Sequence, residues 1–359
     1  MLDGTLPPAR PVFGLRNLEQ RLPRLIRALE PTGVWVLLDR RAEPAVGVAL
    51  QNALTRLGLP SRIFRFTAAE RNKSLAQLEK LAGAFLRAGA DRGGLILGVG
   101  GGITTDMAGF LAATLMRGCA WAAIPTTLLG MSDAALGGKT AVNLPEGKNL
   151  LGAFHQPAFV LADIASLRTL PDREWGSGLG EVLKSGMIAS PALLRRIEKT
   201  QPHAIRRAGS EALALARAAA GVKMKIVEAD PLEGGQRKLL NLGHTFGHAL
   251  ETAAGPRKLA HGEAVGLGLL CASRMAVDLG LARPTYAAQT LALLQRCGLP
   301  TRYPGRLPQT AALSKLIGRD KKKSGKTVDV ILPIRPGVCE IFPGRAPREL
   351  AEVIAHTLG

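Results

Sequence analysis

Three of the chain's six histidines gather in one short stretch of the sequence. His244 and His248 stand in NLGHTFGHALE, and His261 opens the segment HGEAVGLG. Residues four apart share one face of a helix, so His244 and His248 lie on the same side, and His261 can fold back beside them. Neutral imidazoles in such a group typically bind a divalent metal. The spacing alone leaves His244 and His248 as equal candidates for the ligand.

A carboxylate completes the candidate metal site. Glu181 stands in GLGEVLKSGMI, a helical stretch rich in small and apolar residues, where an unpaired carboxylate would be costly to bury. One glutamate and two histidines leave an open coordination position for a substrate. The alternative is that the histidines are ordinary exposed helix residues, which their clustering disfavours. HExxH, the metalloprotease signature, is absent from the sequence, so we do not expect peptide hydrolysis.

A glycine-rich loop forms a second candidate site. The segment LILGVGGGITTDMAGF places glycines 98 and 100–102 after a predicted strand and before a helix with Asp106 in its first turn. Glycines let the backbone approach a pyrophosphate, and the N–H groups of a helix N-terminus can bind it. A glycine run alone could be a tight turn. A second loop, at 124–143, and the residues after it add side chains that could hold a nucleotide against a substrate: Thr126, Thr127, Asp133, Lys139, Lys148 and Asn149.

Basic side chains accompany these motifs and favour an anionic substrate. Phosphate and carboxylate groups bind the fork of arginine or the point charge of lysine. Any single lysine could instead lie on a solvated helix surface. The basic residues beside glycine-, histidine- or acid-bearing motifs are Arg117, Lys139, Lys148, Lys184, Lys223, Arg237 and the run 321–323.

The elements that must position these motifs fall into two parts. Short β-type runs at 34–38, 62–66, 95–99, 121–124 and 159–162 alternate with helical stretches such as 75–88, which indicates a parallel α/β sheet. After Pro171 the β signal nearly disappears until Val-rich runs at 328–332 and 338–342, which predict a small hairpin. We therefore expect a Rossmann-like α/β nucleotide-binding domain at 1–172 and a mainly helical, metal- and substrate-binding domain at 173–359.

Composition narrows the class of protein. With 359 residues, 47% of them hydrophobic, the chain can bury a large core. Its four scattered cysteines and its lack of a secretory or membrane-spanning segment favour the cytoplasm. The formal net charge of +19 attracts anions. Because the basic residues are spread along the chain without aromatic interleaving, we expect no dedicated nucleic-acid groove.

Taken together, the motifs resemble those of the 3-dehydroquinate synthase family. The segments that carry the likeness run in the family's order between residues 95 and 265: GGGxxxDMAGF, PTTLLxxxDxxxGGKTAVN, GKNLLGAFHQP, LRTLPxRE, GxxEVLKSGMI, RKLLNLGHTFGHALE and HGEAVGLG. The resemblance implies an N-terminal NAD-binding α/β domain, a helical metal-binding domain, an active site in the interdomain cleft, and a homodimer.

The resemblance also implies a role for each matching residue. Glu181, His244 and His261 would hold zinc or cobalt, and His248 would be a catalytic residue that is not a ligand. Substrate contacts are implied for Asp133, Lys139, Asn149, Lys184, Lys223, Arg237, Asn241 and Lys322, with Arg117 reaching in from a neighbouring subunit. Dinucleotide contacts are implied for Asp39, Glu70, Lys73, Gly101, Gly102, Asp106, Thr126, Thr127, Asp133, Lys139, Lys148, Asn149, Thr169, Leu170 and Glu174.

The implied activity is a carbon–oxygen lyase step of the shikimate pathway, which leads to chorismate and the aromatic amino acids. It converts 3-deoxy-D-arabino-heptulosonate 7-phosphate into 3-dehydroquinate and phosphate. Transient oxidation by NAD turns a secondary alcohol into a ketone, which acidifies the adjacent C–H so that phosphate can leave. The ketone is then reduced again, the ring opens, and the enolate closes on a carbonyl. The metal would polarise the reacting oxygen, and basic side chains would stabilise the enolate and phosphate charges.

The chain departs from the family pattern at a few positions. The glycine loop continues with Ile-Thr-Thr at 103–105, and Ala-Ala at 134–135 replaces two serines. Asp39 stands where the family more often has asparagine, and Arg40 and Arg41 follow it. An acid there suits a free ribose hydroxyl, whereas two arginines could tolerate a 2′-phosphate. NAD is therefore the favoured cofactor, with NADP as the alternative.

Three other functions stay open at this point. Another sugar-phosphate cyclase would share the loop and the metal ligands but act on a substrate without a carboxylate, which Arg237, Asn241 and His248 disfavour. A metal-dependent polyol dehydrogenase would release NADH. A basic scaffold or nucleic-acid binder on the same fold would show salt-sensitive binding, and the intact set of candidate ligands argues against it.

Overall fold

The structure is a computed structural model that describes residues 9–255, 258–319 and 327–359. Contacts between Cα atoms divide the chain into two compact units, of which the first comprises 1–171 and 207–232 and the second 172–206 and 233–359. Helix α8 (Ser210–Ala229) therefore belongs to the first unit, although it lies beyond residue 172, where the sequence suggests a domain boundary. A functional division at that residue remains a proposal.

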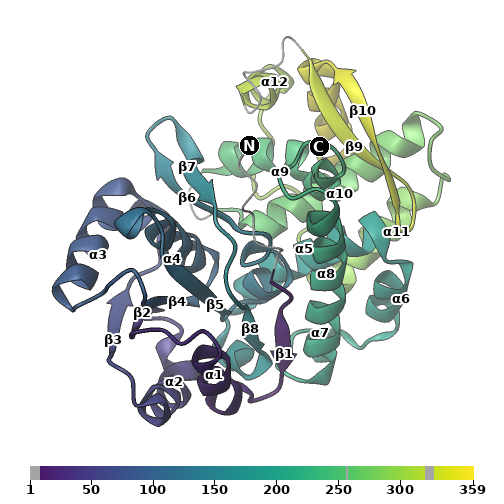
Figure 1. Cartoon of the computed structure of the whole chain (residues 1–359). Coiled ribbons are helices and arrows are strands. Elements are labelled where there is room, and N and C mark those ends of the chain that lie inside the picture. Colours follow the sequence, from purple (N-terminus) through teal and green to yellow (C-terminus); the bar gives the residue numbers. More distant parts are fainter. Residues whose placement is uncertain (1–8, 256–257, 320–326) are drawn as a thin grey trace. The chain divides into compact units, whose positions relative to one another are not determined.

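A four-stranded parallel sheet forms the centre of the first unit, as the alternating runs predict. Its strands lie in the order β3-β2-β4-β5 (Figure 1). The strand order therefore reverses between β2 and β4, and doubly wound sheets bind ligands at the carboxyl ends of the strands beside such a reversal. The strands are β2 (Val34–Asp39), β3 (Ser61–Phe66), β4 (Leu95–Gly100) and β5 (Ala120–Pro125).

Helices cover both faces of this sheet, which explains why all six residues of β2 are buried. On one face, alternate residues such as Val36 and Leu97 form a core with α1 and α2. On the other face α4 packs so closely that a Cβ at Gly98 would lie 2.7 Å from Cβ of Ala108. The helices around the sheet are α1 (Leu18–Arg27), α2 (Glu43–Leu57), α3 (Leu75–Arg87) and α4 (Gly102–Thr114).

The first unit also contains two pairs of strands outside this sheet. The sequence predicts a loop at 124–143, and the last part of this prediction is wrong. Residues from 139 onward form β6 (Lys139–Leu144), which pairs with β7 (Gly147–Phe154) in an antiparallel hairpin. Its alternation of buried Thr140 and Val142 with more exposed neighbours is too short to stand out among glycines. The run predicted at 159–162 supplies β8 (Leu161–Asp163), which pairs with β1 (Val12–Gly14).

The second unit is mainly helical, as predicted. The two Val-rich runs form the predicted hairpin, with β9 (Val328–Arg335) and β10 (Val338–Arg345) antiparallel. Within the described part of the chain, no helix is long and apolar enough to cross a membrane. The α-helices of this unit are α5 (Asp172–Ala189), α6 (Pro191–Lys199), α7 (Pro202–Ile205), α9 (His244–Ala254), α10 (His261–Asp278), α11 (Tyr286–Arg296), α12 (Thr310–Arg319) and α13 (Pro347–Leu358).

Backbone contacts at glycines hold α5 and the start of α9 against α10. A Cβ at Gly180 would lie 2.2 Å from the carbonyl oxygen of Gly262, and a Cβ at Gly262 would lie 1.9 Å from that of Ser177. Likewise, a Cβ at Gly268 would lie 2.0 Å from the carbonyl oxygen of Gly243. Because only glycine permits such close backbone approach, these residues fix where the three helices meet.

Candidate active site

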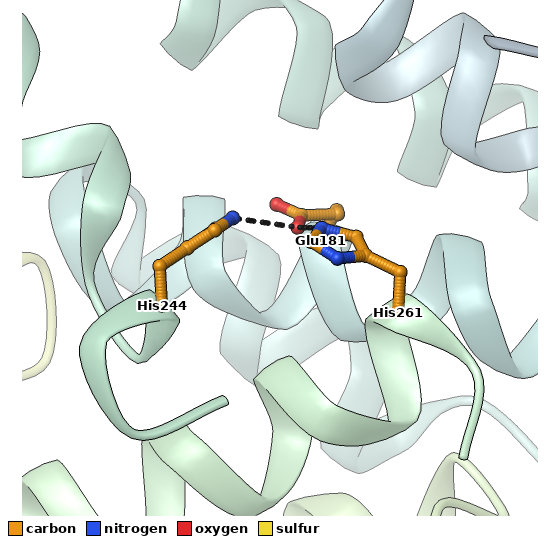
Figure 2. A group of neighbouring side chains, drawn as sticks. All are labelled: Glu181, His244 and His261. Carbon is orange, nitrogen blue, oxygen red and sulfur yellow. Dashed lines mark ion pairs between the residues drawn. The ribbon is translucent and has the colours of Figure 1, made fainter. Parts of the chain in front are cut away.

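Three side chains converge where α5, α9 and α10 meet in the second unit (Figure 2). Glu181 comes from the middle of α5, and His244 and His261 are the first residues of α9 and α10. Nε2 of His244 lies 3.5 Å, and Nε2 of His261 3.3 Å, from Oε1 of Glu181. One ligand atom from each residue lies within 4.8 Å of the others. The structure thus brings together the three residues for which the resemblance implies metal binding.

The burial of Glu181 tests whether a metal fits this group. The residue is 1% exposed, and among the described residues neither carboxylate oxygen has a hydrogen-bond partner of acceptable geometry. Lys184, one turn further along α5, is close enough to Oε2 for an ion pair. A buried carboxylate that faces two imidazole nitrogens is a donor set that suits zinc or a similar divalent ion.

A second carboxylate lies behind the histidines. Oε2 of Glu251, on α9, is 3.2 Å from Nδ1 of His261, and the carbonyl oxygen of Leu242 is 3.2 Å from Nδ1 of His244. Partners on Nδ1 leave Nε2 of each ring facing Glu181, as is usual behind metal-bound histidines. Glu251 is not among the site residues predicted from the sequence. Its spacing of seven residues from His244 on a predicted helix was an available signal, because such residues share a face.

The charges around His261 change its affinity for protons. Burial lowers the pKa of the ring, but the close carboxylate of Glu181, the hydrogen bond with Glu251 and the negative charges of both glutamates outweigh this effect and raise the pKa to about 9. In the absence of a metal the ring is therefore protonated at neutral pH. A cation bound by Glu181 and His261 must displace that proton.

His248 lies beside the three-residue group without belonging to it. Its ring centroid is 5.3 Å from that of His244, at a perpendicular angle, and 6.0 Å from that of His261. An imidazole at this position can exchange a proton with a molecule held by the group. This arrangement separates His244 from His248, which the spacing alone could not do.

Other predicted substrate contacts in the second unit lie at the same helices or in η5 (Gln236–Asn241). Lys184 and Arg237 are 2% and 1% exposed, so both of these basic side chains are buried. Asn241, at the end of η5, donates a 3.4 Å hydrogen bond to Glu233. Glu174, predicted as a dinucleotide contact, stands in the first turn of α5. Buried cations of this kind suit an anionic ligand.

In the first unit, several predicted dinucleotide contacts lie at the carboxyl edge of the parallel sheet. Asp39 ends β2 and is 7% exposed, and Oδ1 of its carboxylate accepts a 3.2 Å hydrogen bond from the backbone of Arg41. The backbone N–H of Thr126 donates to the carbonyl oxygen of Gly100, which ends β4. A Cβ at Gly101 would lie 3.1 Å from Thr127, so the two loops lie side by side. This edge, with the N-terminus of α4, is the usual phosphate-binding position of such sheets.

Lys73 connects three segments beside this edge. It follows η1 (Glu70–Asn72), is 4% exposed, and places its Nζ atom 2.5 Å from Oδ2 of Asp106. The same ammonium donates a hydrogen bond to the side chain of Asn149 on β7. Burial raises the pKa of Asp106, and the charge of Lys73 opposes that shift. Three residues with predicted ligand contacts thus form one hydrogen-bonded group around the buried Lys73.

A second ion pair joins two predicted substrate contacts of the first unit. Lys223 on α8 pairs with the carboxylate of Asp133 in η3 (Gly130–Ala134) and donates a 2.8 Å hydrogen bond to its carbonyl oxygen. Lys223 is 9% exposed, so the pair is largely shielded from solvent. These two segments, which are distant in the sequence, are therefore neighbours in the fold.

The remaining predicted residues are less buried. Arg117 is exposed in η2 (Leu115–Arg117), where its φ of 66° is left-handed. Thr169 and Leu170 lie at the end of η4 (Ile164–Thr169). Glu70, Lys139, Lys148 and Asn149 are exposed on η1, β6 and β7. Lys322 lies outside the described residues.

Comparison with known families and curated proteins gives a consistent result. Models of the N-terminal and C-terminal parts of 3-dehydroquinate synthase match residues 63–177 and 178–323. The chain is 39% identical over 344 residues to the 3-dehydroquinate synthase of Symbiobacterium thermophilum, and this match covers 94% of each chain. It is 43% identical over 290 residues to the enzyme of the same name from Halorhodospira halophila, and this match covers 80% of this chain and 81% of the relative.

Solved structures of sugar-phosphate cyclases and dehydrogenases share the fold. A 2-epi-5-epi-valiolone synthase from Streptomyces hygroscopicus, with NAD⁺ and Zn²⁺ bound, has a TM-score of 0.89 at 26% identity and covers 99% of this chain and 98% of its own. A 2-deoxy-scyllo-inosose synthase, with NAD⁺ and Co²⁺, has a TM-score of 0.85 at 27% identity, and the match covers 97% of this chain and 96% of the synthase. A glycerol dehydrogenase from Schizosaccharomyces pombe, 20% identical, shows likeness of fold alone.

The sequence matches and the geometry point in the same direction. Both family models together span more than half of the chain, and the motifs that they cover carry the Glu181 group and the glycine loop. The chain belongs to the 3-dehydroquinate synthase family.

Proposed function

We propose that the protein converts 3-deoxy-D-arabino-heptulosonate 7-phosphate into 3-dehydroquinate and phosphate. The observation that carries this proposal is the buried Glu181 carboxylate facing His244 and His261 in a chain of this family. Identities of 39% and 43% to curated 3-dehydroquinate synthases exceed the 26% and 27% to the two other cyclases, which favours this substrate. The reaction class is a carbon–oxygen lyase acting on a phosphate.

The proposed cofactors are NAD and one divalent ion, zinc or cobalt. Both have been found with the two structurally similar cyclases. When bound, NAD would supply reversible oxidation of an alcohol and the ion would supply polarisation of the reacting oxygen. Glu181, His244 and His261 would hold the ion, because their oxygen and nitrogen donors already converge.

The first unit would hold NAD at the carboxyl edge of its sheet. Gly101, Gly102 and the first turn of α4 would receive the pyrophosphate, since backbone N–H groups at a helix N-terminus bind anions. Thr126 and Thr127 line the neighbouring loop. The buried acid Asp39 would accept a ribose hydroxyl and repel a 2′-phosphate, which supports NAD over NADP.

The basic residues would bind the substrate and stabilise charge as it develops. Lys184 and Arg237 would attract carboxylate or phosphate oxygens. Because both side chains are buried, little water would screen this attraction. Lys223, paired with Asp133, would add a further positive group. His248 would carry protons to and from the substrate, because its ring lies next to the proposed metal ligands.

The proposal extends to assembly and location. We infer a homodimer in which Arg117 serves the neighbouring subunit, and the exposure of this arginine supports that role. We also infer that the enzyme works in the cytoplasm as part of the shikimate pathway, without membrane or nucleic-acid partners.

The experiment that tests the choice of substrate is a comparison of turnover with matched sugar phosphates. Purified protein with NAD and zinc is given the heptulosonate phosphate, and separately a sugar phosphate that lacks the carboxylate, and the products are identified by NMR. A carbocyclic acid from the first substrate alone supports the proposal. A carbocycle from the second alone would assign the chain to another cyclase activity.

A further inference from the structure

Asn143 lies where hairpin β6–β7 meets the segment between η1 and α3. The register of the hairpin shifts between Val142 and Leu144, so Asn143 is not part of the regular pairing. It instead forms a parallel bridge with Ser74, and its backbone N–H donates a 2.8 Å hydrogen bond to the carbonyl oxygen of Lys73. The irregularity in the hairpin thus brings Asn143 to a different part of the chain.

The side-chain amide of Asn143 both donates and accepts hydrogen bonds. Nδ2 donates to a carboxylate oxygen of Glu70 at 2.7 Å and to the carbonyl oxygen of Glu70 at 3.3 Å. Oδ1 accepts a 3.0 Å hydrogen bond from the backbone N–H of Asn149. Only an amide side chain combines a donor and an acceptor in this form. An aspartate of the same size would keep the acceptor but set a second negative charge against Glu70.

The bond to Asn149 holds a residue with an uncommon backbone conformation. Asn149 has a φ of 57°, in the left-handed region that few residues other than glycine adopt and that asparagine tolerates better than most. Its backbone N–H is bonded to Asn143, and its side-chain oxygen accepts a hydrogen bond from Lys73. Asn143 therefore joins the end of β6, the start of β7 and the segment of Glu70 and Lys73.

We propose that Asn143 is a positioning residue that holds these two segments together and thereby sets the affinity of the protein for NAD. The inference rests on the proposed function, because the family resemblance behind that function implies dinucleotide contacts for Glu70, Lys73 and Asn149. Asn143 acts through these neighbours. Without the hydrogen bonds that Asn143 donates and accepts, the turn of the hairpin becomes less ordered. The residues that contact NAD must then be ordered when it binds, and this costs binding free energy.

The test compares Asn143→Asp with Asn52→Asp, which makes the same change at an exposed position of α2. NAD binding is measured by titration calorimetry, and hydrogen–deuterium exchange is followed at residues 70–73 and 147–149. We expect Asn143→Asp to weaken NAD binding about tenfold and to speed exchange in both segments, with unchanged zinc affinity. Asn52→Asp should match the wild type in every measurement.

A double variant separates positioning from general damage. Adding Glu70→Gln to Asn143→Asp provides an amide that can donate to the new carboxylate, so exchange in both segments should return toward the wild-type rate. Asn143→Ala, which adds no charge, should speed exchange as well if the aspartate variant does not fold.

The outcomes also separate this inference from the proposed function. Wild-type exchange at both segments in Asn143→Asp, or wild-type NAD affinity together with faster exchange, would overturn the role of Asn143. Wild-type protein that bound no NAD would count against the proposed function, and the exchange measurements would still decide whether Asn143 joins the two segments.

Discussion

The imidazole ring of His261 lies between two carboxylates: its Nδ1 atom is 3.2 Å from Oε2 of Glu251, and its Nε2 atom faces Glu181. The carboxylate of Glu251 fixes the orientation of the ring and increases the basicity of the nitrogen that would bind a metal. Glu251 therefore belongs to the proposed metal site although it does not reach the ion.

Replacing Glu251 by glutamine should weaken zinc binding by about tenfold to a hundredfold. The amide keeps the size of the side chain but removes its negative charge from His261. Competition with a fluorescent chelator measures the affinity. Glu198→Gln, an exposed change on α6, is the control and should bind zinc as the wild type does. Equal affinities in the two variants would show that Glu251 has no part in the site.

The raised pKa of His261 predicts a pH dependence of the metal-free protein. The folded pKa is about 9 and the ordinary value is 6.5, so the proton bound by the folded state stabilises it fully below pH 6.5. This contribution is lost as the pH rises toward 9. The melting temperature of metal-free protein should therefore fall across this window, and the fall should be smaller in His261→Gln. A wild-type protein with the same slope as that variant would contradict the assignment.

The close contact of α5 and α10 predicts a large effect of one methyl group. Gly262→Ala would place a Cβ 1.9 Å from the carbonyl oxygen of Ser177, so the two helices must separate. We expect a loss of about 1–3 kcal/mol in unfolding free energy and weaker zinc binding, because Glu181 and His261 lie on these helices. Urea unfolding with and without zinc measures both effects.

Gly221→Ala is the matched control for this change. Apart from the adjoining backbone of α8 itself, no atom of the described residues lies within 4 Å of a Cβ at Gly221, so the alanine should stabilise the helix by up to about 1 kcal/mol. Loss of stability in Gly262→Ala without any change in zinc affinity would mean that the helix contact does not position the ligands.

The positions of His244 and His248 predict different losses. His244→Ala should release the metal and abolish turnover, because its Nε2 atom belongs to the converging group. His248→Ala should keep the metal and lower kcat by about a hundredfold or more, because only proton transfer is impaired. Metal content by mass spectrometry and steady-state kinetics measure the two effects. A His248 variant without metal would reverse this division of roles.

Much of this arrangement could be predicted from the sequence. The strands of the parallel sheet appear as continuous apolar runs because helices bury both of their faces, as in β2. The metal group could be predicted because His244 and His261 are rare residue types close together in the chain. The spacing could not choose between His244 and His248, since both lie on one helix face and only the packing of α10 decides between them.

Other features depend on contacts that a sequence does not display. Glycine-rich helices were evident, but not that Gly262 would touch the backbone of Ser177. The loop predicted at 124–143 includes most of β6, because the alternation of buried and exposed residues in this strand is short and directly follows two glycines. Lys73 was assigned to the cofactor, and the pairing of its ammonium with Asp106 joins segments that no local pattern connects.

The most direct test of the central claim is phosphate release from 3-deoxy-D-arabino-heptulosonate 7-phosphate by the purified protein, with NADH absorbance followed in the same cuvette. We predict that release requires both NAD and zinc and that no NADH accumulates, because the oxidation is reversed within each turnover. Accumulation of NADH without phosphate would contradict this account and identify a dehydrogenase.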